Sequence, residues 1–379
     1  MKFEIDRDVL ADAIAWTARS VPQRRMAAEI LSGVRISAAA DGDVEFAAFD
    51  REVSAKVNVP ADVQEPGIVL VSGKLLSNIA KLLPNKPVVF ELSGSKVQII
   101  CDKSVFTLLT MPVDEYPNLP TFPERSGVID APEFVNAASQ VAIAAGRDEQ
   151  FPLLTGIRFE VDGDNITMFA TDRYRLAKRN IKWKPESQDY STAALIKAKT
   201  ITDIAKTLGT DSAELELSLT TEDGPKLVGF SGSGKQATSQ LIDGDYKLPI
   251  HSLFPDESPI SAVVATQTLI DAVKRVSLVA ESSAPIILSF TEGQVELSAG
   301  RGDDAQASEV IPAELTGEDI SIAFNPQYLL DGLSILGTDF VRLSMTHPIK
   351  PVDFTGQDSL DGDNDESYRY LLVPIRVAI

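Results

Sequence analysis

The chain has 379 residues, 44% of them hydrophobic, which is enough to build two or three domains with separate cores. It carries 35 basic and 55 acidic residues, a net charge of −20. Nucleic acid is therefore repelled at long range, and only a locally basic surface can contact it. The single cysteine, Cys101, excludes an internal disulfide and a multi-thiolate metal site, and we expect it to be a partly buried strand residue.

The beginning of the chain mixes charged and apolar residues, without the basic and apolar regions of a secretion signal. The longest apolar runs are much shorter than the roughly 18 residues that a membrane span needs. Together with the single cysteine, these features lead us to expect a soluble, cytoplasmic protein.

Two helical segments occur three times along the chain, at similar spacings. The first reads DVLADAIAW from Asp8, PEFVNAASQ from Pro132 and QTLIDAVKR from Gln267. The second reads LLSNIAKLL at 75–83, TITDIAKTL at 200–208 and YLLDGLSIL at 328–336. Recurrence of the same pair of segments indicates an internal repeat.

Alternating apolar and polar residues follow each first helical segment. They flank a tight acidic turn at Asp41-Gly42, Asp162-Gly163 and Glu292-Gly293. Period-two alternation around such a turn predicts a β-hairpin in each copy.

Proline-punctuated stretches at 114–120 and 243–249 are typical of linkers. We therefore predict an α+β protein of three similar domains, 1–122, 123–252 and 253–379, each with two helices and several antiparallel strands. The alternative, one large α/β enzyme, would need strands alternating with longer helices and glycine-rich turns, which the sequence lacks.

The segment GFSGSGKQ, from Gly229 to Gln236, resembles a phosphate-binding loop with Lys235 on the phosphates. Gln236, however, replaces the serine or threonine that would hold magnesium, and the residues after it indicate a strand, not a helix. We expect a hairpin turn here, and a nucleotide-dependent enzyme remains the second hypothesis.

The acidic run Asp361 to Glu366 lacks the glycine and the final glutamate of a calcium loop, so we expect a mobile surface loop. The two histidines, His251 and His347, lie in turn-like contexts without a partner for catalysis or metal binding. We therefore expect no catalytic residue, no metal and no cofactor.

Basic residues concentrate on the repeated helices, where a shared positive face is possible; ordinary solvated helix charge is the alternative. Those on or near the second helices are Lys74, Lys81, Lys197, Lys199 and Lys206, and those near the first helices are Arg19, Arg24, Arg25, Arg147, Lys274 and Arg275.

The middle copy contains a basic stretch, ATDRYRLAKRN at 170–180. It aligns with AFDREVSAK at 48–56 and AGRGDDA at 299–305, but only the middle copy has Tyr174, Arg175 and Leu176. A requirement of the fold would appear in every copy, so these residues indicate a function specific to the middle domain. An apolar residue beside cations suits a partner groove; an idiosyncratic strand edge is the alternative.

The threefold repeat, ATDRYRLA at 170–177, the proline-punctuated linkers and LLVPIRV at 371–377 together resemble the bacterial DNA polymerase III beta subunit, closest to actinobacterial members. The resemblance implies the DNA clamp fold, in which two protomers join head to tail into a ring with helices inside and sheets outside. It also implies a non-catalytic processivity factor that encircles duplex DNA without sequence preference and tethers the replicative polymerase.

In this family, short peptides of polymerases, the clamp loader and repair proteins, including ligase, dock between the second and third domains. Three replacements distinguish this groove from that of many relatives: Arg173 replaces a small residue, and Val373 and Ile375 replace methionines. The matching groove positions are Leu154, Thr171, Arg173, Tyr174, Arg175, Leu176, Leu253, Tyr328, Pro351, Leu371, Val373, Pro374, Ile375 and Arg376.

The resemblance also assigns two further surfaces. The dimer interface would join Phe106 of the first domain to Leu278 and Val279 of the third. A third hypothesis is a stand-alone multidomain scaffold without DNA. The DNA-facing residues would be Arg24, Arg25, Lys74, Lys197 and Lys199.

Overall fold

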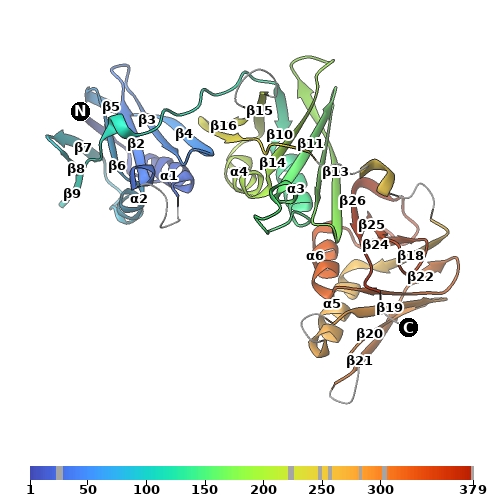
Figure 1. Cartoon of the computed structure of the whole chain (residues 1–379). Helices are drawn as coiled ribbons and strands as arrows, with labels where there is room; N and C mark the ends of the chain where they lie inside the picture. The colour runs from blue at the N-terminus through green and yellow to red at the C-terminus, as the bar shows by residue number, and fades with distance from the viewer. Residues whose placement is uncertain are drawn as a thin grey trace. The chain divides into compact units, whose positions relative to one another are not determined.

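The computed structural model describes residues 1–22, 29–220, 226–245, 250–254, 258–280, 284–300 and 305–376. Two compact units make up the chain (Figure 1). The N-terminal unit contains Met1–Phe134, Trp183–Gln188 and Asp203–Leu241, and the C-terminal unit contains Val135–Lys182, Asp189–Thr202 and Ile242–Ile379. The middle repeat thus contributes to both units, and the predicted domain boundaries at 122 and 252 stay a prediction.

The N-terminal unit has two antiparallel sheets. The first has the order β5-β1-β7-β8-β9, with β5 Asp62–Glu65, β1 Lys2–Ile5, β7 Val88–Ser93, β8 Lys96–Cys101 and β9 Ser104–Leu109. The second has the order β6-β2-β3-β4-β17-β16-β15-β10, with β6 Gly67–Ser72, β2 Gly33–Ala38, β3 Asp43–Phe49, β4 Val53–Pro60, β17 Lys235–Gln240, β16 Leu227–Gly232, β15 Glu214–Thr220 and β10 Gly127–Asp130.

The C-terminal unit also has two antiparallel sheets. The larger has the order β14-β11-β12-β13-β26-β25-β24-β18-β22, with β14 Ser191–Lys197, β11 Gly156–Asp162, β12 Asn165–Thr171, β13 Arg175–Pro185, β26 Asp365–Leu372, β25 Val352–Gln357, β24 Phe340–Met345, β18 Ile260–Ala265 and β22 Glu314–Thr316. The smaller has the order β21-β20-β19-β23, with β21 Ala307–Pro312, β20 Gln294–Ala299, β19 Ile286–Thr291 and β23 Ile320–Phe324.

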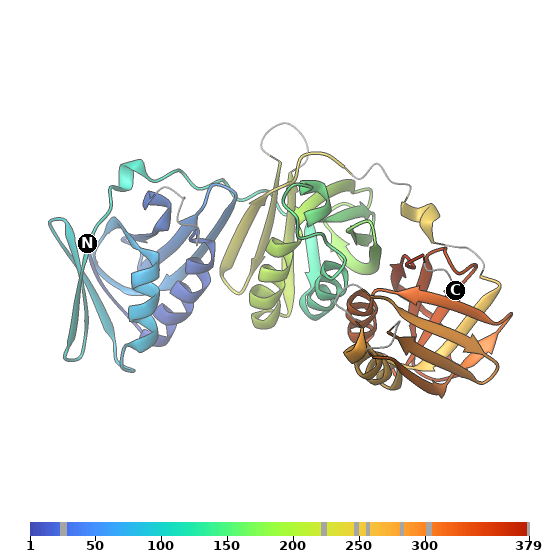
Figure 2. The ribbon, with the colours of Figure 1, turned by 60° about the horizontal axis from the view of Figure 1, so that its bottom comes forward.

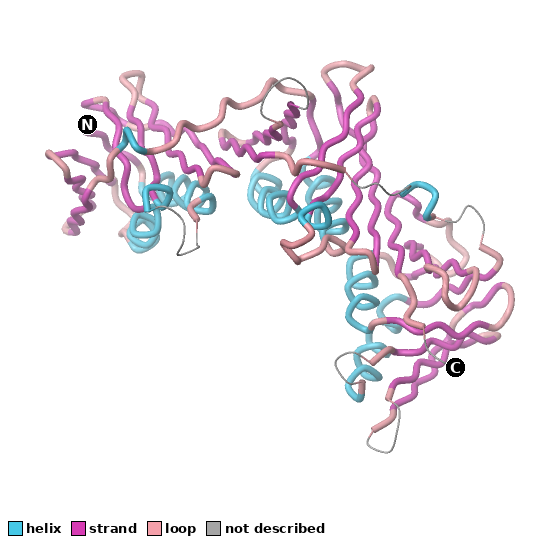
Figure 3. The backbone as a smooth tube through the Cα atoms, viewed as in Figure 1, coloured by secondary structure: helices cyan, strands magenta, loops and turns pink. Residues whose placement is uncertain are grey.

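Within the described residues, each repeat contributes two α-helices, as predicted. α1 (Arg7–Thr17) and α2 (Gly73–Leu82) pack against each other in the N-terminal unit, and Figure 2 shows them side by side. α5 (Thr266–Val276) and α6 (Pro326–Leu336) do the same in the C-terminal unit, as the helix colouring of Figure 3 shows. The helices of the middle repeat are α3 (Ala131–Ala142) and α4 (Ala198–Asp211).

Local sequence explains where α6 begins and ends. The side chain of Asn325 accepts hydrogen bonds from the amides of Gln327 and Tyr328, and Pro326 occupies the first turn, where its missing N–H costs nothing. Gly337 follows the last turn with φ 74°, a left-handed conformation that favours glycine. These signals fix the helix that carries Tyr328 into the candidate site.

The three predicted hairpins are confirmed. β2 pairs with β3, β11 with β12 and β19 with β20. Gly42, Gly163 and Gly293 have φ values of 98°, 54° and 77°, which a turn of this kind requires.

The segment GFSGSGKQ is the predicted hairpin, because β16 and β17 pair and Ser233 and Gly234 form the turn. The buried Lys235 ammonium lies 3.0 Å from a carboxylate oxygen of Asp12 and 2.8 Å from one of Asp211. The hydrogen bond from Lys235 lowers the pKa of Asp211 below its ordinary value. Lys235 is therefore part of an ion-paired contact within the N-terminal unit.

The remaining sequence expectations fall on strands and loops. Cys101 ends β8 and is fully buried. The acidic run begins in the loop before β26, and Asp365 and Glu366 already belong to that strand. His347 lies in a loop, where its ring nitrogen accepts a hydrogen bond from the Ile349 amide. No helix in the described ranges is long and apolar enough to cross a membrane.

Replacing Gly332 by alanine is expected to destabilise the C-terminal unit. Gly332 of α6 faces the fully buried ring of Tyr370, and a methyl group there would overlap ring carbons Cδ1 and Cε1. Overpacking outweighs the better helix propensity of alanine, so Gly332→Ala should lower the free energy of unfolding by about 1–2 kcal/mol, measured by urea denaturation. The control is Ser334→Ala on the exposed side of the same helix, and an equal effect of both variants would contradict this packing.

Candidate functional site

The turn between β12 and β13 carries the residues that only the middle copy has. Asp172 shapes it: its Oδ1 accepts hydrogen bonds from the amides of Tyr174 and Arg175, both 3.0 Å long. Arg173 has φ 81°, a left-handed conformation that is uncommon for a residue other than glycine. The Thr171 hydroxyl donates to the Arg175 carbonyl over 2.7 Å, which closes the turn.

The first repeat has the same turn. Asp50 Oδ1 accepts from the amides of Glu52 and Val53 at 2.9 and 2.7 Å, and Arg51 has φ 80°. This confirms that the two turns share a scaffold. Their side chains differ, as the sequence comparison indicated. In the third copy, Arg301 lies outside the described residues.

Arg175 is the best-connected residue of the turn and is only 5% exposed. Its Nε lies 2.9 Å from Asp172 Oδ2, and its Nη1 lies 2.6 Å from Asp331 Oδ2 on α6. Burial by itself lowers the pKa of Arg175, but the oxygens of Tyr370, Asp331 and Asp172 outweigh it and raise the pKa above its ordinary value. The guanidinium therefore stays charged and connects the turn to α6.

Aromatic rings surround this guanidinium. Arg175 lies over the ring of Tyr328 at 4.3 Å from its centroid, and the rings of Tyr174 and Tyr328 are stacked at 6.1 Å. Tyr174 is nevertheless 55% exposed. On the other side of the turn, Arg173 lies over the ring of Phe151 at 4.7 Å. Exposed rings backed by fixed cations offer a surface for an apolar ligand group.

A cavity of about 430 Å³ lies between the turn, α6 and residues 145–154. It combines aromatic walls with charged groups, the composition expected of a binding site. Its lining residues are Ala145, Gly146, Arg147, Asp148, Phe151, Leu154, Asp172, Arg173, Tyr174, Arg175, Gln327, Tyr328 and Asp331.

The last strand of the chain runs beside the turn. β13 and β26 are antiparallel, with Leu176 opposite Leu371, and the Val373 amide donates to the Tyr174 carbonyl over 2.9 Å. Residues nearly 200 positions apart in sequence are thus neighbours in one sheet.

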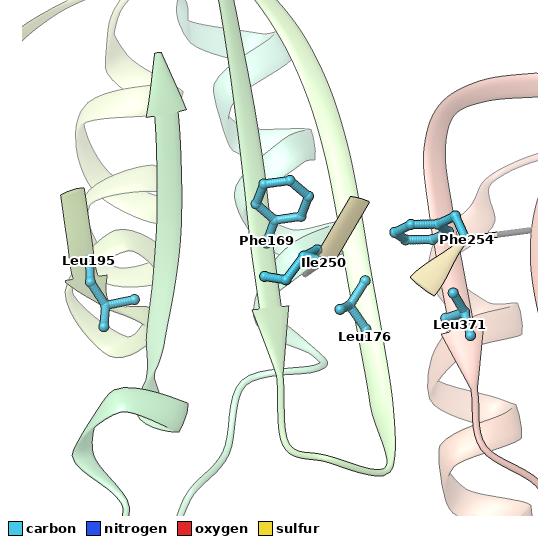
Figure 4. Packing of buried hydrophobic residues seen from close by; sticks show 6 residues of the cluster. All are labelled: Phe169, Leu176, Leu195, Ile250, Phe254 and Leu371. Carbon is cyan, nitrogen blue, oxygen red and sulfur yellow. The ribbon is translucent and has the colours of Figure 1, made fainter. Parts of the chain in front are cut away.

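Leu176 and Leu371 belong to an apolar cluster behind the turn, shown in Figure 4. Phe254 packs there, with Lys178 and Arg369 lying over its ring at 5.6 and 4.6 Å from the centroid. Lys178 and Arg369 lie opposite each other on β13 and β26, and the contact of each cation with the face of this ring offsets part of their mutual repulsion. The other members of the cluster are Phe169, Leu195 and Ile250, with Leu153, Leu154 and Ile242 packed against it.

The predicted groove residues all lie in the C-terminal unit, but in different positions. Five line the cavity: Leu154, Arg173, Tyr174, Arg175 and Tyr328. Leu176 and Leu371 pack behind it, and Thr171 and Val373 bond to the turn backbone. None of the remaining five lines this cavity: exposed Leu253 and Arg376, half-buried Pro351 and Ile375, and buried Pro374.

Several lining residues were absent from the prediction, among them Arg147, Phe151, Gln327 and Asp331. Asp331 follows Tyr328 by three residues on α6, so helical periodicity could have indicated that both share a face. No comparable signal marks Phe151, because it lies in an irregular segment whose position depends on tertiary packing.

The residues predicted for the other surfaces are far apart in the chain. Lys74 is exposed in α2, Lys197 is half-buried at the end of β14, and Lys199 is exposed in α4. Arg24 and Arg25 lie outside the described residues. The predicted interface residues are Phe106, which is exposed on the edge strand β9, and Leu278 and Val279, which follow α5.

Three family models match consecutive parts of the chain. They describe the N-terminal, central and C-terminal domains of the DNA polymerase III beta subunit and match residues 1–120, 128–248 and 251–376. The beta sliding clamp of Streptomyces coelicolor is 47% identical over 380 residues and 100% of both chains. That of Micrococcus luteus is 48% identical over 83% of this chain and 100% of the relative.

Solved structures agree with these matches. The DNA polymerase sliding clamp of Bacillus subtilis has a TM-score of 0.91 and 28% identity, with 100% of both chains covered. The sliding clamp of Pseudomonas aeruginosa bound to griselimycin has a TM-score of 0.91 and 25% identity over the same coverage. The chain belongs to the DNA polymerase III beta subunit family, and its fold is three α+β clamp domains with antiparallel sheets.

Removing the Arg175 cation is expected to weaken the fold as well as the site. Arg175→Leu leaves the carboxylates of Asp172 and Asp331 without their shared partner, and we expect a loss of about 2 kcal/mol in the free energy of unfolding by urea denaturation. The double variant Arg175→Leu with Asp331→Leu should recover part of this loss, because one stranded carboxylate is gone. A single variant as stable as the unmodified chain would contradict the role assigned to Arg175.

Proposed function

We propose that two copies of this sliding clamp join head to tail into a ring that encircles duplex DNA and tethers a replicative polymerase. The observation that carries the proposal is the match of all three family domains along one chain, together with full-length relatives named beta sliding clamp. The ring performs no catalysis; it raises the effective concentration of its partner at the primer end. The ring needs no cofactor and acts in the cytoplasm.

The domains of the proposal are 1–122, 123–252 and 253–379. Lys74 of α2, Lys197 at the end of β14 and Lys199 of α4 face the DNA. Arg24 and Arg25, which lie outside the described residues, share this role. Retention by a closed ring is topological, so a few phosphate contacts suffice and sliding continues. The charge of −20 then belongs mainly to surfaces that do not touch DNA.

The cavity beside Tyr174 is the docking site for short peptides of polymerases, the clamp loader and repair proteins, including ligase. Its exposed rings, Tyr174 and Phe151, accept the apolar anchors, and Leu176 and Leu371 support the wall from behind. The other groove residues that the resemblance assigns, including Leu253 and the segment after Leu372, extend the surface along the peptide.

Each unit offers a free sheet edge for the ring contact. β9 ends one sheet and exposes Val105, Phe106 and Leu109, and β21 ends another and exposes Val310. Leu278, near α5, is 83% exposed. An open edge with apolar side chains invites pairing with a second chain, and a head-to-tail contact of different edges closes into a ring when the rotation permits.

The second hypothesis, a nucleotide-dependent enzyme, would require Lys235 to bind phosphate. Lys235 already has two carboxylate partners, Asp12 and Asp211, and the segment around it is a strand pair. Within the described ranges, no group of three histidine, cysteine, aspartate or glutamate side chains is arranged for a metal ion.

Light scattering should give about twice the 40.9 kDa chain mass. Phe106→Asp places a charge in the proposed interface and should shift the protein to monomer at micromolar concentration. The control is Ile349→Asp, which alters an exposed apolar residue outside the interface and should leave the dimer intact. If the unmodified chain is strictly monomeric at micromolar concentration, the proposed ring is contradicted.

Tyr174→Ala should lower the affinity for a peptide of the Gln-Leu-x-Leu-Phe type about tenfold in fluorescence polarisation, because it removes an aromatic contact. Dimerisation should not change, since Tyr174 lies in the turn between β12 and β13 and on neither of the proposed edge strands, β9 and β21. Lys182→Ala, an exposed change on β13, the strand that follows the turn, is the matched control. Unchanged peptide affinity in Tyr174→Ala would remove the cavity from the docking site.

A further inference from the structure

Most carboxylate oxygens that line the cavity already accept hydrogen bonds within the protein. Both oxygens of Asp172 accept from the turn and from Arg175. Asp331 Oδ1 accepts from Gln327 Nε2 over 2.7 Å, and Asp331 Oδ2 accepts from Arg175. Asp148 Oδ1 accepts from the Gln150 amide over 2.9 Å. Five of the six carboxylate oxygens that line the cavity are thus engaged within the protein.

The cations are used differently. Arg175 is engaged with two carboxylates, whereas the guanidiniums of Arg147 and Arg173 make no hydrogen bond or ion pair with any residue in the described part of the chain. Each guanidinium has five N–H donors and no acceptor. The hydrogen-bonding groups of the cavity that remain unused are therefore mainly charged donors, which favour a negatively charged acceptor.

Arg173 is held in a suitable orientation. Its backbone is fixed at φ 81° by the Asp172 turn, and its guanidinium lies over the ring of Phe151. A guanidinium that stacks through its flat face keeps its in-plane N–H groups available. Less conformational entropy is then lost when those groups bind a ligand.

We propose that Arg173, assisted by Arg147, recognises a carboxylate next to the apolar anchor of the docked peptide, so that the cavity selects acidic peptides over neutral ones. The inference rests on the proposed docking function and specifies the chemistry of its partner. Arg173 would be a specificity residue, and Phe151 would position it.

The charge of the whole chain makes the selection local. At −20 the protein repels an acidic peptide at long range, so any preference for the acid must arise from contacts inside the cavity. The preference for the acidic peptide should also weaken as salt is added, because the two arginines lie at an exposed rim of the cavity.

The test uses two synthetic fluorescent peptides, Gln-Leu-Asp-Leu-Phe and Gln-Leu-Asn-Leu-Phe, which differ in one charge. Fluorescence polarisation with the full chain should show about fivefold tighter binding of the aspartate peptide. Arg173→Gln should bring the ratio to about one by weakening the aspartate peptide alone. Phe151→Leu should reduce the ratio as well. Lys182→Gln removes a positive charge from β13 outside the cavity and should preserve the ratio.

The possible outcomes distinguish carboxylate recognition by Arg173 from the proposed docking function on which it rests. Equal binding of both peptides to the unmodified chain, or an unchanged ratio in Arg173→Gln, overturns the carboxylate recognition and leaves docking intact. Binding of neither peptide overturns the docking function and this inference with it. A thermal melt of Arg173→Gln confirms folding, which the exposed position of this side chain makes the expected result.

Discussion

The buried guanidinium of Arg175 is the interaction on which the candidate site depends. It lies between Asp172, which shapes the turn, and Asp331, which lies on α6, and it supports the ring of Tyr328 from one side. A cation with so little exposure is stable only because both carboxylates are present, and either carboxylate alone would be costly at this depth. Segments distant in sequence are therefore fixed together, and the exposed Tyr174 ring receives a rigid support instead of a mobile loop.

The proposed ring would also explain how an acidic chain can work on DNA and still bind other proteins. In the proposed ring, encirclement would separate retention from affinity, so the surface assigned to DNA would need only scattered basic residues such as Lys74 and Lys199, and the remaining surface could be acidic. Docking, as proposed, would depend on one compact apolar and cationic cavity, where short-range contacts with rings and arginines would outweigh the unfavourable long-range field. Selectivity among partners would follow from Arg173, whose orientation is set by a turn that the first repeat also contains.

Much of this architecture was predictable from sequence. Repeated helices and acidic hairpin turns depend on local patterns, so the two helices of each repeat and the hairpins at Gly42, Gly163 and Gly293 were predicted correctly. Internal comparison also separated the shared turn from the residues that form the site. The cavity wall at Phe151 was missed because the position of this residue follows from tertiary packing and leaves no periodic trace. Asp331 was missed although it follows Tyr328 by three residues on α6, a spacing that places both on one face. The left-handed backbone of Arg173 was missed for a related reason: arginine rarely adopts it, and only the Asp172 side chain reveals the turn.

Release from DNA ends tests the central claim most directly. The chain is loaded by a clamp loader onto nicked circular DNA, the complex is washed at high salt, and the protein that remains is measured before and after a single restriction cut. A closed ring predicts stable retention on the circle and rapid loss once the DNA is linear, since only the topology has changed. Equal retention on circular and linear DNA would show that contacts hold the protein, and it would contradict a sliding clamp.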